Sequence, residues 1–172
     1  MNSQQLRKIL DSDEFTSLLN PTVKSLDEFL STDLTFPSMS VVNFDTSNQP
    51  GSHWVAVNLT ETGVAEYFDS YGDIVPNIQI ESKLKITGSF KKNELVFQGF
   101  STVCGQYCLV FLLLRARNYS YNDIMSKLLS VESSQERDTA INAVINVLYC
   151  GKILKKPMHV YDEEILNSLT GK

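Results

Sequence analysis

The sequence has few cysteines, few histidines and no long apolar run. Its 172 residues include three cysteines and two histidines. An odd and low number of cysteines does not fit the disulfide framework of a secreted domain, so we expect an intracellular, reducing compartment. The longest purely apolar stretch, residues 108–114, is far shorter than the roughly 20 residues that span a bilayer. The first ten residues also lack the apolar core of a signal peptide, so we expect no membrane partner.

Basic residues are outnumbered by acidic ones. The chain has 15 Lys and Arg against 20 Asp and Glu, which gives a formal net charge of −5 at pH 7 and a pI near 5.0. This balance argues against nucleic acid or an anionic membrane as the main partner. Hydrophobic residues make up 42% and charged residues 20%, as in an ordinary globular protein. The length predicts a single domain over residues 1–172.

Hydrophobic periodicity predicts an α+β domain. Apolar residues spaced three and four apart indicate helices, and alternation of apolar and polar residues indicates strands. We expect helices over residues 4–10, 104–117, 121–129, 134–148 and 163–169, and strands over residues 39–44, 53–59, 64–68 and 94–97. The second and third strands are close enough in sequence to form a hairpin. The order of elements predicts a small antiparallel or mixed sheet packed on a central helix that begins at Cys104.

Cys104 follows a polar loop and begins the most apolar predicted helix. A thiol at a helix N-terminus faces unpaired backbone N–H groups and the positive end of the helix dipole, and both stabilise a thiolate. Gly105 beside it leaves room for a substrate backbone to approach. The alternative interpretation is a small buried hydrophobic residue, because most free cysteines are of that kind.

A thiol nucleophile needs a base, and the two histidines differ in their surroundings. His53 begins an apolar strand directly after a Pro-Gly turn, whereas His159 lies in a polar tail. If the predicted hairpin forms, His53 and Asp69 become neighbours at the same edge of the sheet, where the carboxylate can orient the imidazole. The alternatives are a strand-edge histidine with a satisfied ring nitrogen, and an aspartate that opens a type I turn ending at Gly72.

Gln98 lies shortly before Cys104, at the end of the short strand predicted for residues 94–97. A neutral amide there can donate an N–H to a developing oxyanion without disturbing a thiolate–imidazolium pair. A surface glutamine in a loop is the alternative. Trp54, which is the only tryptophan, directly follows His53.

The remaining cysteines do not form a metal motif. Cys108 lies one helical turn after Cys104, but the pair lacks the Cys-X₂-Cys spacing and the clustered histidines of a zinc site. We therefore expect no metal, and we interpret Cys108 and Cys150 as core residues. The sequence contains no dinucleotide-binding, Walker or EF-hand motif, so we expect no cofactor.

The order of these motifs resembles that of cysteine proteases of the adenovirus endopeptidase (adenain) type, which are related to the ubiquitin-like-protein-specific proteases. The resemblance covers about residues 25–117 and rests on Gly51-Ser52-His53-Trp54, on Phe68-Asp69-Ser70-Tyr71-Gly72, and on Gln98 followed by Val103-Cys104-Gly105-Gln106-Tyr107-Cys108.

The resemblance implies a papain-like fold in which the chain order is His, acid, Cys. It implies His53 as general base, Asp69 as orienting acid, Cys104 as nucleophile and Gln98 as oxyanion donor. Trp54 would line the substrate site, as the aromatic residue after the histidine does in the family.

Two positions depart from the family pattern. Adenovirus enzymes usually carry Glu where Asp69 stands, and the ubiquitin-like-protein proteases usually carry Asp where Val103 stands. We therefore favour a branch from DNA viruses or virus-like transposons. Adenovirus enzymes are activated by a short viral peptide and by DNA. The acidic pI argues against DNA here, and the sequence assigns no position to an activating peptide.

The first functional hypothesis is a monomeric viral cysteine endopeptidase. The resemblance implies that it cleaves structural or precursor proteins after small residues, often Gly, in the virion or in the cytoplasm or nucleus of an infected cell. One alternative is an isopeptidase of the deubiquitinase or deSUMOylase kind. Another, from a different class, is a catalytically inert binding module on the same fold.

Overall fold

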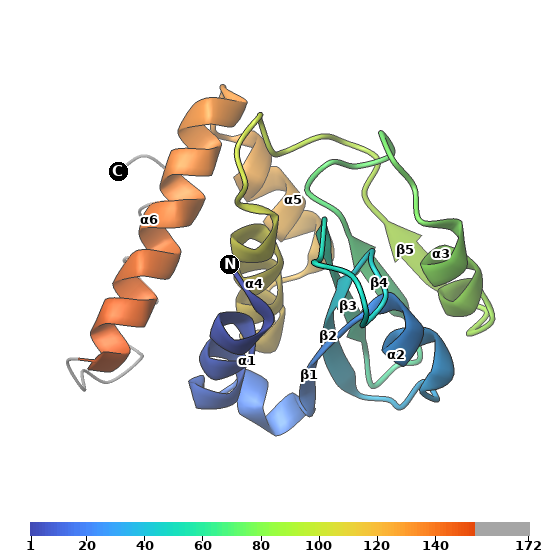
Figure 1. The fold of residues 1–172 in the computed structure, drawn as a ribbon. Helices are drawn as coiled ribbons and strands as arrows, with labels where there is room; N and C mark the ends of the chain where they lie inside the picture. The colour runs from blue at the N-terminus through green and yellow to red at the C-terminus, as the bar shows by residue number, and fades with distance from the viewer. Residues whose placement is uncertain (154–172) are drawn as a thin grey trace.

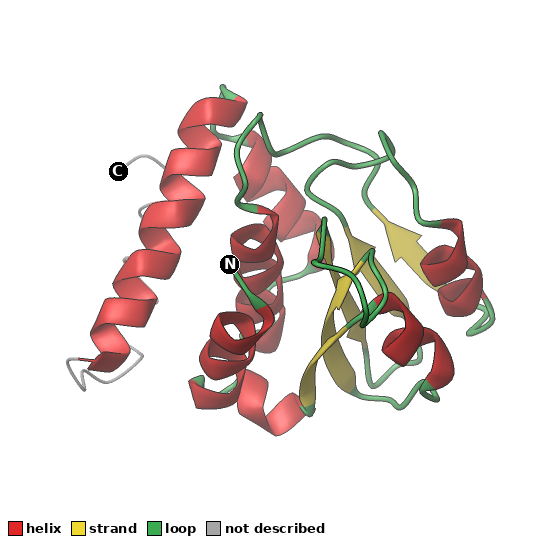
Figure 2. Ribbon diagram, in the orientation of Figure 1, coloured by secondary structure: helices red, strands yellow, loops and turns green. Residues whose placement is uncertain are grey.

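The structure is a computed structural model that describes residues 1–153, with helices on both faces of one sheet (Figures 1 and 2). The helices are α1 (Ser3–Ser12), α2 (Leu26–Ser31), α3 (Ile78–Lys85), α4 (Cys104–Ala116), α5 (Tyr121–Leu129) and α6 (Ser134–Ile153), with a 3₁₀ helix η1 (Thr16–Leu19). The strands are β1 (Pro21–Lys24), β2 (Ser38–Asn43), β3 (Trp54–Leu59), β4 (Ala65–Phe68) and β5 (Phe90–Lys92). No helix within the described range is long and apolar enough to cross a membrane.

The sheet is mixed, and its five strands lie in sequence order from β1 to β5. The three central strands, β2, β3 and β4, pair antiparallel, while β1 pairs with β2 and β5 pairs with β4 in parallel. The predicted hairpin is β3–β4, with Ala56 opposite Phe68 and Leu59 opposite Ala65. The α+β class and the mixed sheet expected from the sequence are therefore confirmed.

Each face of the sheet packs against its own group of helices, because successive side chains of a strand point to opposite faces. Val41, Ala56 and Phe68 belong to the larger core with α1, α4, α5 and α6. Val42, Val55 and Tyr67 belong to a smaller core with α2 and α3. Helix α4 is buried over ten consecutive residues, and the ring of Phe111 stacks on Phe68 at 4.8 Å between centroids. This explains why the sequence of α4 is apolar on all sides.

The helices and the hairpin lie close to their predicted positions, but the segments around them differ. Strand β1, helix α2 and helix α3 were not assigned from the sequence, because each is short and weakly periodic. The predicted helix over residues 163–169 and His159 lie outside the described residues.

The strand predicted for residues 94–97 is wrong. The strand in this region is β5, and residues 94–97 form a loop. Phe97 is fully buried because it packs in the larger core, where its ring lies 5.8 Å from that of Phe68. It does not belong to a β-ladder. The backbone N–H groups of Phe97 and Gln98 both donate to Ser70 O, at 2.8 and 3.0 Å. The burial of Phe97 in an anchored loop therefore gave the sequence an apolar pattern that is also typical of a strand.

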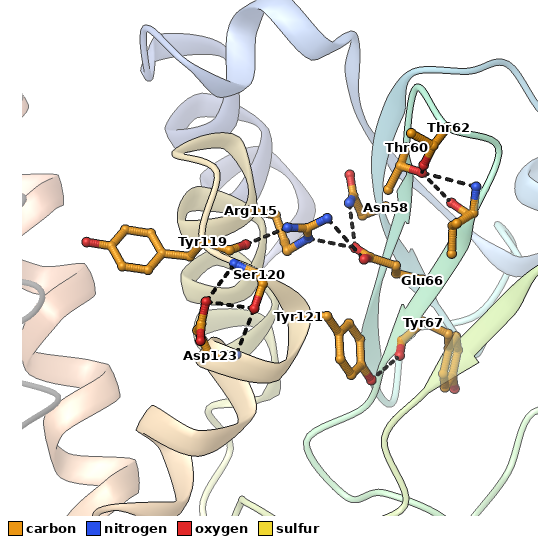
Figure 3. A network of polar contacts seen from close by, with 11 residues as sticks. Asn58, Thr60, Thr62, Glu66, Tyr67, Arg115, Tyr119, Ser120, Tyr121 and Asp123 are labelled. Atoms are coloured by element: carbon orange, nitrogen blue, oxygen red, sulfur yellow. Dashed lines mark hydrogen bonds and ion pairs between the residues drawn. The ribbon is translucent and has the colours of Figure 1, made fainter.

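A buried ion pair joins the C-terminal end of α4 to the β3–β4 hairpin (Figure 3). Arg115 Nε and Nη2 donate to the two oxygens of Glu66 at 2.7 and 3.0 Å, and Asn58 Nδ2 donates to Glu66 Oε2 at 2.7 Å. Arg115 also donates to Tyr119 O, and Tyr121 Oη donates to Tyr67 O at 3.1 Å. The bonds of Arg115 with Glu66 hold the helix that begins at Cys104 against the hairpin that follows His53, and the bond of Tyr121 joins α5 to β4.

We expect Glu66→Gln to destabilise the fold, because it leaves the Arg115 guanidinium without its bidentate partner in a largely buried position. The expected loss is about 3 kcal/mol of unfolding free energy, as for other broken buried pairs. Urea unfolding followed by circular dichroism measures it. Glu132→Gln, at an exposed position, is the control and should change stability by less than about 0.5 kcal/mol. Equal stability of the two variants would contradict the structural role of the pair.

Candidate active site

His53 and Asp69 meet at one edge of the sheet. His53 directly precedes β3, Asp69 directly follows β4, and the antiparallel register brings these two chain positions together. His53 Nε2 lies 2.7 Å from Asp69 Oδ1. The side chain of Asp69 is 1% exposed and that of His53 is 12% exposed. The contact therefore lies almost entirely out of water.

Several donors hold Asp69 in place. Its Oδ1 accepts the backbone N–H of Tyr71 at 2.8 Å, and its Oδ2 accepts Tyr67 Oη at 3.4 Å. The side chain of Asn93 clamps the backbone of Asp69: Asp69 N donates to Asn93 Oδ1 at 2.9 Å, and Asn93 Nδ2 donates to Asp69 O at 2.6 Å. Asn93 is a site residue that sequence reasoning missed, since no pattern linked it to Asp69.

Asp69 also opens a turn, as the alternative interpretation proposed. Gly72 N donates to Asp69 O at 3.0 Å, and Gly72 has a φ of +59°. A Cβ on Gly72 would lie only 2.3 Å from Glu94 O, so a side chain does not fit there. The turn and the histidine contact coexist, because the turn closes on the backbone carbonyl of Asp69 and Oδ1 accepts both Tyr71 N and the imidazole.

The imidazole of His53 lies between two aromatic rings. Phe44 meets it edge-on and Tyr71 lies tilted against it, each with ring centroids 4.9 Å apart. Since Nε2 is bonded to Asp69, Nδ1 is the ring nitrogen left for the thiol of Cys104. Burial would lower the pKa of His53, but the hydrogen bonds with Asp69 and with Cys104 raise it to about 9.

Cys104 is the first residue of α4, as predicted. The residue before it, Val103, makes no side-chain cap, so the first turn of the helix keeps its N–H groups free of a capping side chain. Burial would raise the pKa of the Cys104 thiol, but a hydrogen bond with His53 and the backbone N–H groups of Trp54 and Gly105 lower it below its usual value. The opposite shifts of the two pKa values favour a thiolate–imidazolium pair.

Gln98 is buried rather than on the surface, with 3% exposure, and it follows a loop rather than a strand. Its Oε1 accepts Ser70 Oγ at 2.7 Å. Its Nε2 donates to Ser101 O at 2.6 Å and to Tyr71 Oη at 3.1 Å. The amide is therefore fixed in orientation beside the ring that covers His53.

Asp138 on α6 holds the loop that leads to Cys104. It accepts hydrogen bonds from Gly99 N, from Ser101 Oγ at 2.6 Å and from Tyr107 Oη at 2.9 Å. The neighbouring Arg137 donates to Phe97 O at 2.6 Å. Both side chains are buried. The sequence analysis did not identify them. A charged residue on the same helical face as Ile141 and Ile145 could have indicated a buried polar contact.

The environment of Gly105 differs from the prediction of free space for a substrate backbone. Gly105 is buried, and a Cβ there would lie 3.3 Å from Leu6 and 3.5 Å from Trp54. Its missing side chain thus lets α4 pack closely against α1 and Trp54, and the space beside it is filled. Trp54 is half-buried.

Cys108 is fully buried and burial raises the pKa of its thiol, as befits a core residue. The side chain of Cys150 lies outside the described part of the structure. Within that part, His, Cys, Asp and Glu side chains form no group of three that could hold a metal ion.

A thiol, an imidazole and a buried carboxylate connected in this way have the chemical parts of a thiol-hydrolase site. No protein-family model matches the sequence. A curated cysteine protease of African swine fever virus is 32% identical over 106 residues, which covers 54% of this chain and 39% of that protein. A crystal structure of the selenomethionine form of that virus's protease aligns with a TM-score of 0.39 and 28% identity, over 58% of this chain and 41% of the other.

The chain is therefore distantly related to a viral cysteine protease, and it spans about two fifths of the length of that relative.

We expect Cys104 to react with iodoacetamide at pH 6 at least about tenfold faster than a free thiol, because a free thiol of pKa about 8.5 is almost wholly protonated there. The lowered pKa of Cys104 keeps its thiolate populated, and the advantage is lost as the pH falls through that pKa. Mass mapping identifies the modified residue. His53→Ala should remove most of the advantage, and equal rates in wild type and variant would contradict the pairing.

Proposed function

We propose that the chain is a thiol endopeptidase. The observation that carries the proposal is the buried contact between His53 Nε2 and Asp69 Oδ1 at 2.7 Å. The thiol of Cys104 lies close enough to this imidazole that each group shifts the pKa of the other. The similarity to a viral cysteine protease supports the proposal independently of the geometry.

The proposed reaction proceeds in two halves. The Cys104 thiolate attacks the scissile carbonyl carbon, and the imidazolium of His53 protonates the leaving amine as the C–N bond breaks. Water, deprotonated by the now neutral His53, then hydrolyses the thioester and releases the acid and the thiol. Asp69 keeps the imidazole oriented and stabilises its charged form throughout.

The oxyanion would bind to the backbone N–H of Cys104 and to Gln98 Nε2. Gln98 already points an N–H at Tyr71 Oη, close to His53, so a substrate oxygen could replace the tyrosine hydroxyl as acceptor.

The resemblance to adenain-type proteases adds a substrate preference to the proposal. It implies precursor proteins cut after small residues, with Trp54 lining the site, and action without a cofactor inside an infected cell. Release of a fluorophore from ubiquitin-like modifier conjugates, faster than from peptides, would instead favour the isopeptidase. Absence of both cleavage and enhanced thiol reactivity would favour the inert module.

We expect Cys104→Ala to lower turnover by at least about 10³-fold, since the nucleophile is lost. The thermal unfolding temperature should stay close to that of the wild type, because Cys104 is only half-buried. The assay uses peptides with Gly-Gly before a fluorophore, and a Gly-Gly vinyl sulfone followed by mass mapping of the adduct. Retained cleavage by the variant, or an adduct on another residue, would contradict the assignment.

We expect Gln98→Ala to lower kcat by about 10²-fold to 10³-fold with little change in KM, as when an oxyanion donor is removed. Ser70→Ala is the matched control, because it removes the bond to Gln98 Oε1 but leaves the donor Nε2 in place. Ser70→Ala should lose less activity than Gln98→Ala, because the bond from Nε2 to Ser101 O still aims the amide. Equal losses in the two variants would contradict the role of Gln98 as oxyanion donor.

A further inference from the structure

Two cavities lie along one face of α6, and the larger reaches the residue before Cys104. The larger, of about 610 Å³, lies between residues 99–103 and α6, and Val103 lines it immediately before Cys104. The smaller, of about 210 Å³, lies between α6, Gln106 of α4 and the N-terminal residues. Asn142 lines both cavities. We call the combined depression the α6 groove.

The α6 groove combines apolar and uncharged polar side chains, and it is nearly uncharged. Besides Asp138, helix α6 lines it with three amides, two hydroxyls and one apolar side chain: Gln135, Asn142, Asn146, Ser134, Thr139 and Ile145. The single charged side chain in its lining is Asp138, whose oxygens are engaged with the loop before Cys104. By contrast, the cavity on the Trp54 side includes Arg7, Lys24, Glu28 and Asp45 in its lining.

Gln106 supplies an independent sign of a missing ligand. The residue is 9% exposed and lines the smaller cavity, while its Oε1 is covered and has no hydrogen-bond partner. Its Nε2 reaches Asn142 Oδ1 only at 3.4 Å. A buried acceptor without a donor costs stability, and a turn of the Gln106 amide toward the cavity would let an N–H group of a ligand satisfy it.

Phe100 stands at the rim of the groove with its ring wholly exposed to solvent. The loop is anchored on both sides of Phe100, because Gly99 N and Ser101 Oγ both donate to Asp138. A large apolar side chain held in water by an anchored loop is typical of a contact surface.

We propose that the α6 groove binds an extended segment of the substrate on one side of the scissile bond, with Phe100 against an apolar side chain of that segment. This inference rests on the proposed function. Amide and hydroxyl side chains both donate and accept, as a peptide backbone requires, while the lack of cationic side chains disfavours nucleic acid. From Gln135 to Asn146 the helix rises about 16 Å, the length of about five extended residues.

The test compares long and short substrates. A library of decapeptides is cleaved with the wild type, one decapeptide cut near its middle is selected, and it is shortened from each end. The variant carries Phe100→Ala and Asn142→Ala. The control carries Ile86→Ala and Asn48→Ala, which remove an exposed apolar side chain and an exposed amide away from the groove.

We expect the wild type and the control to cleave the decapeptide faster than the peptides shortened on one side of the cut. Shortening on the other side should have little effect. In the groove variant, the ratio of kcat/KM for the long over the short peptide should fall about tenfold. In a Cys104→Ala background, fluorescence anisotropy with the labelled decapeptide should show about tenfold weaker binding for the same variant.

Two outcomes overturn the inference, and they differ. If the wild type cleaves the library but the groove variant keeps the full length preference and affinity, the α6 groove is not a substrate site. If the wild type cleaves no peptide and its Cys104 is not labelled by the vinyl sulfone, the proposed function fails and this inference fails with it.

Discussion

The candidate site depends on one buried contact, between the imidazole of His53 and the carboxylate of Asp69, sixteen positions apart in the chain. A carboxylate removed from water costs several kcal/mol unless hydrogen bonds replace its hydration. Tyr71 N and Tyr67 Oη supply part of that replacement, and the imidazole supplies the rest. The β3–β4 hairpin therefore brings the base and its carboxylate together, and their contact in turn supplies part of the stabilisation of that buried carboxylate.

Helix α4 places the thiol of Cys104 beside this pair, and contacts along the helix fix its position. Its apolar surface is buried on all sides, and two ion pairs fasten its C-terminal end: Arg115 with Glu66, and Arg117 with Asp13 at 2.8 Å. Burial would raise the pKa of Asp13, yet its bonds to Arg117 and Thr16 lower it, so the second pair is ionised over the neutral range. These two ion pairs, at the opposite end of the helix from Cys104, thus help to fix the position of α4 and, with it, that of the sulfur.

Local pattern was enough to predict the parts of the site that lie on regular elements. Alternating strands separated by a short turn implied that His53 and Asp69 meet, and the apolar run after Cys104 implied a buried helix. It was not enough for Asn93 or Asp138, which act on the backbone of distant loops and carry no periodic signal. The segment before Gln98 was misassigned for the same reason, since burial of Phe97 comes from a loop anchored on Ser70 rather than from a ladder.

The hydrogen bonds of Gln98 decide how its amide can take part in the proposed reaction. Ser70 holds Oε1 and the Ser101 carbonyl holds one N–H, so rotation of the amide would break two short bonds. The bond to Tyr71 Oη is longer, and that hydroxyl has a second partner in Ser101 O. In the proposed reaction, a substrate oxyanion would replace the longest of the three bonds while the other two keep the amide oriented. Because the donor does not have to reorient, its contribution would come from preorganisation, which is the form in which such donors are most effective.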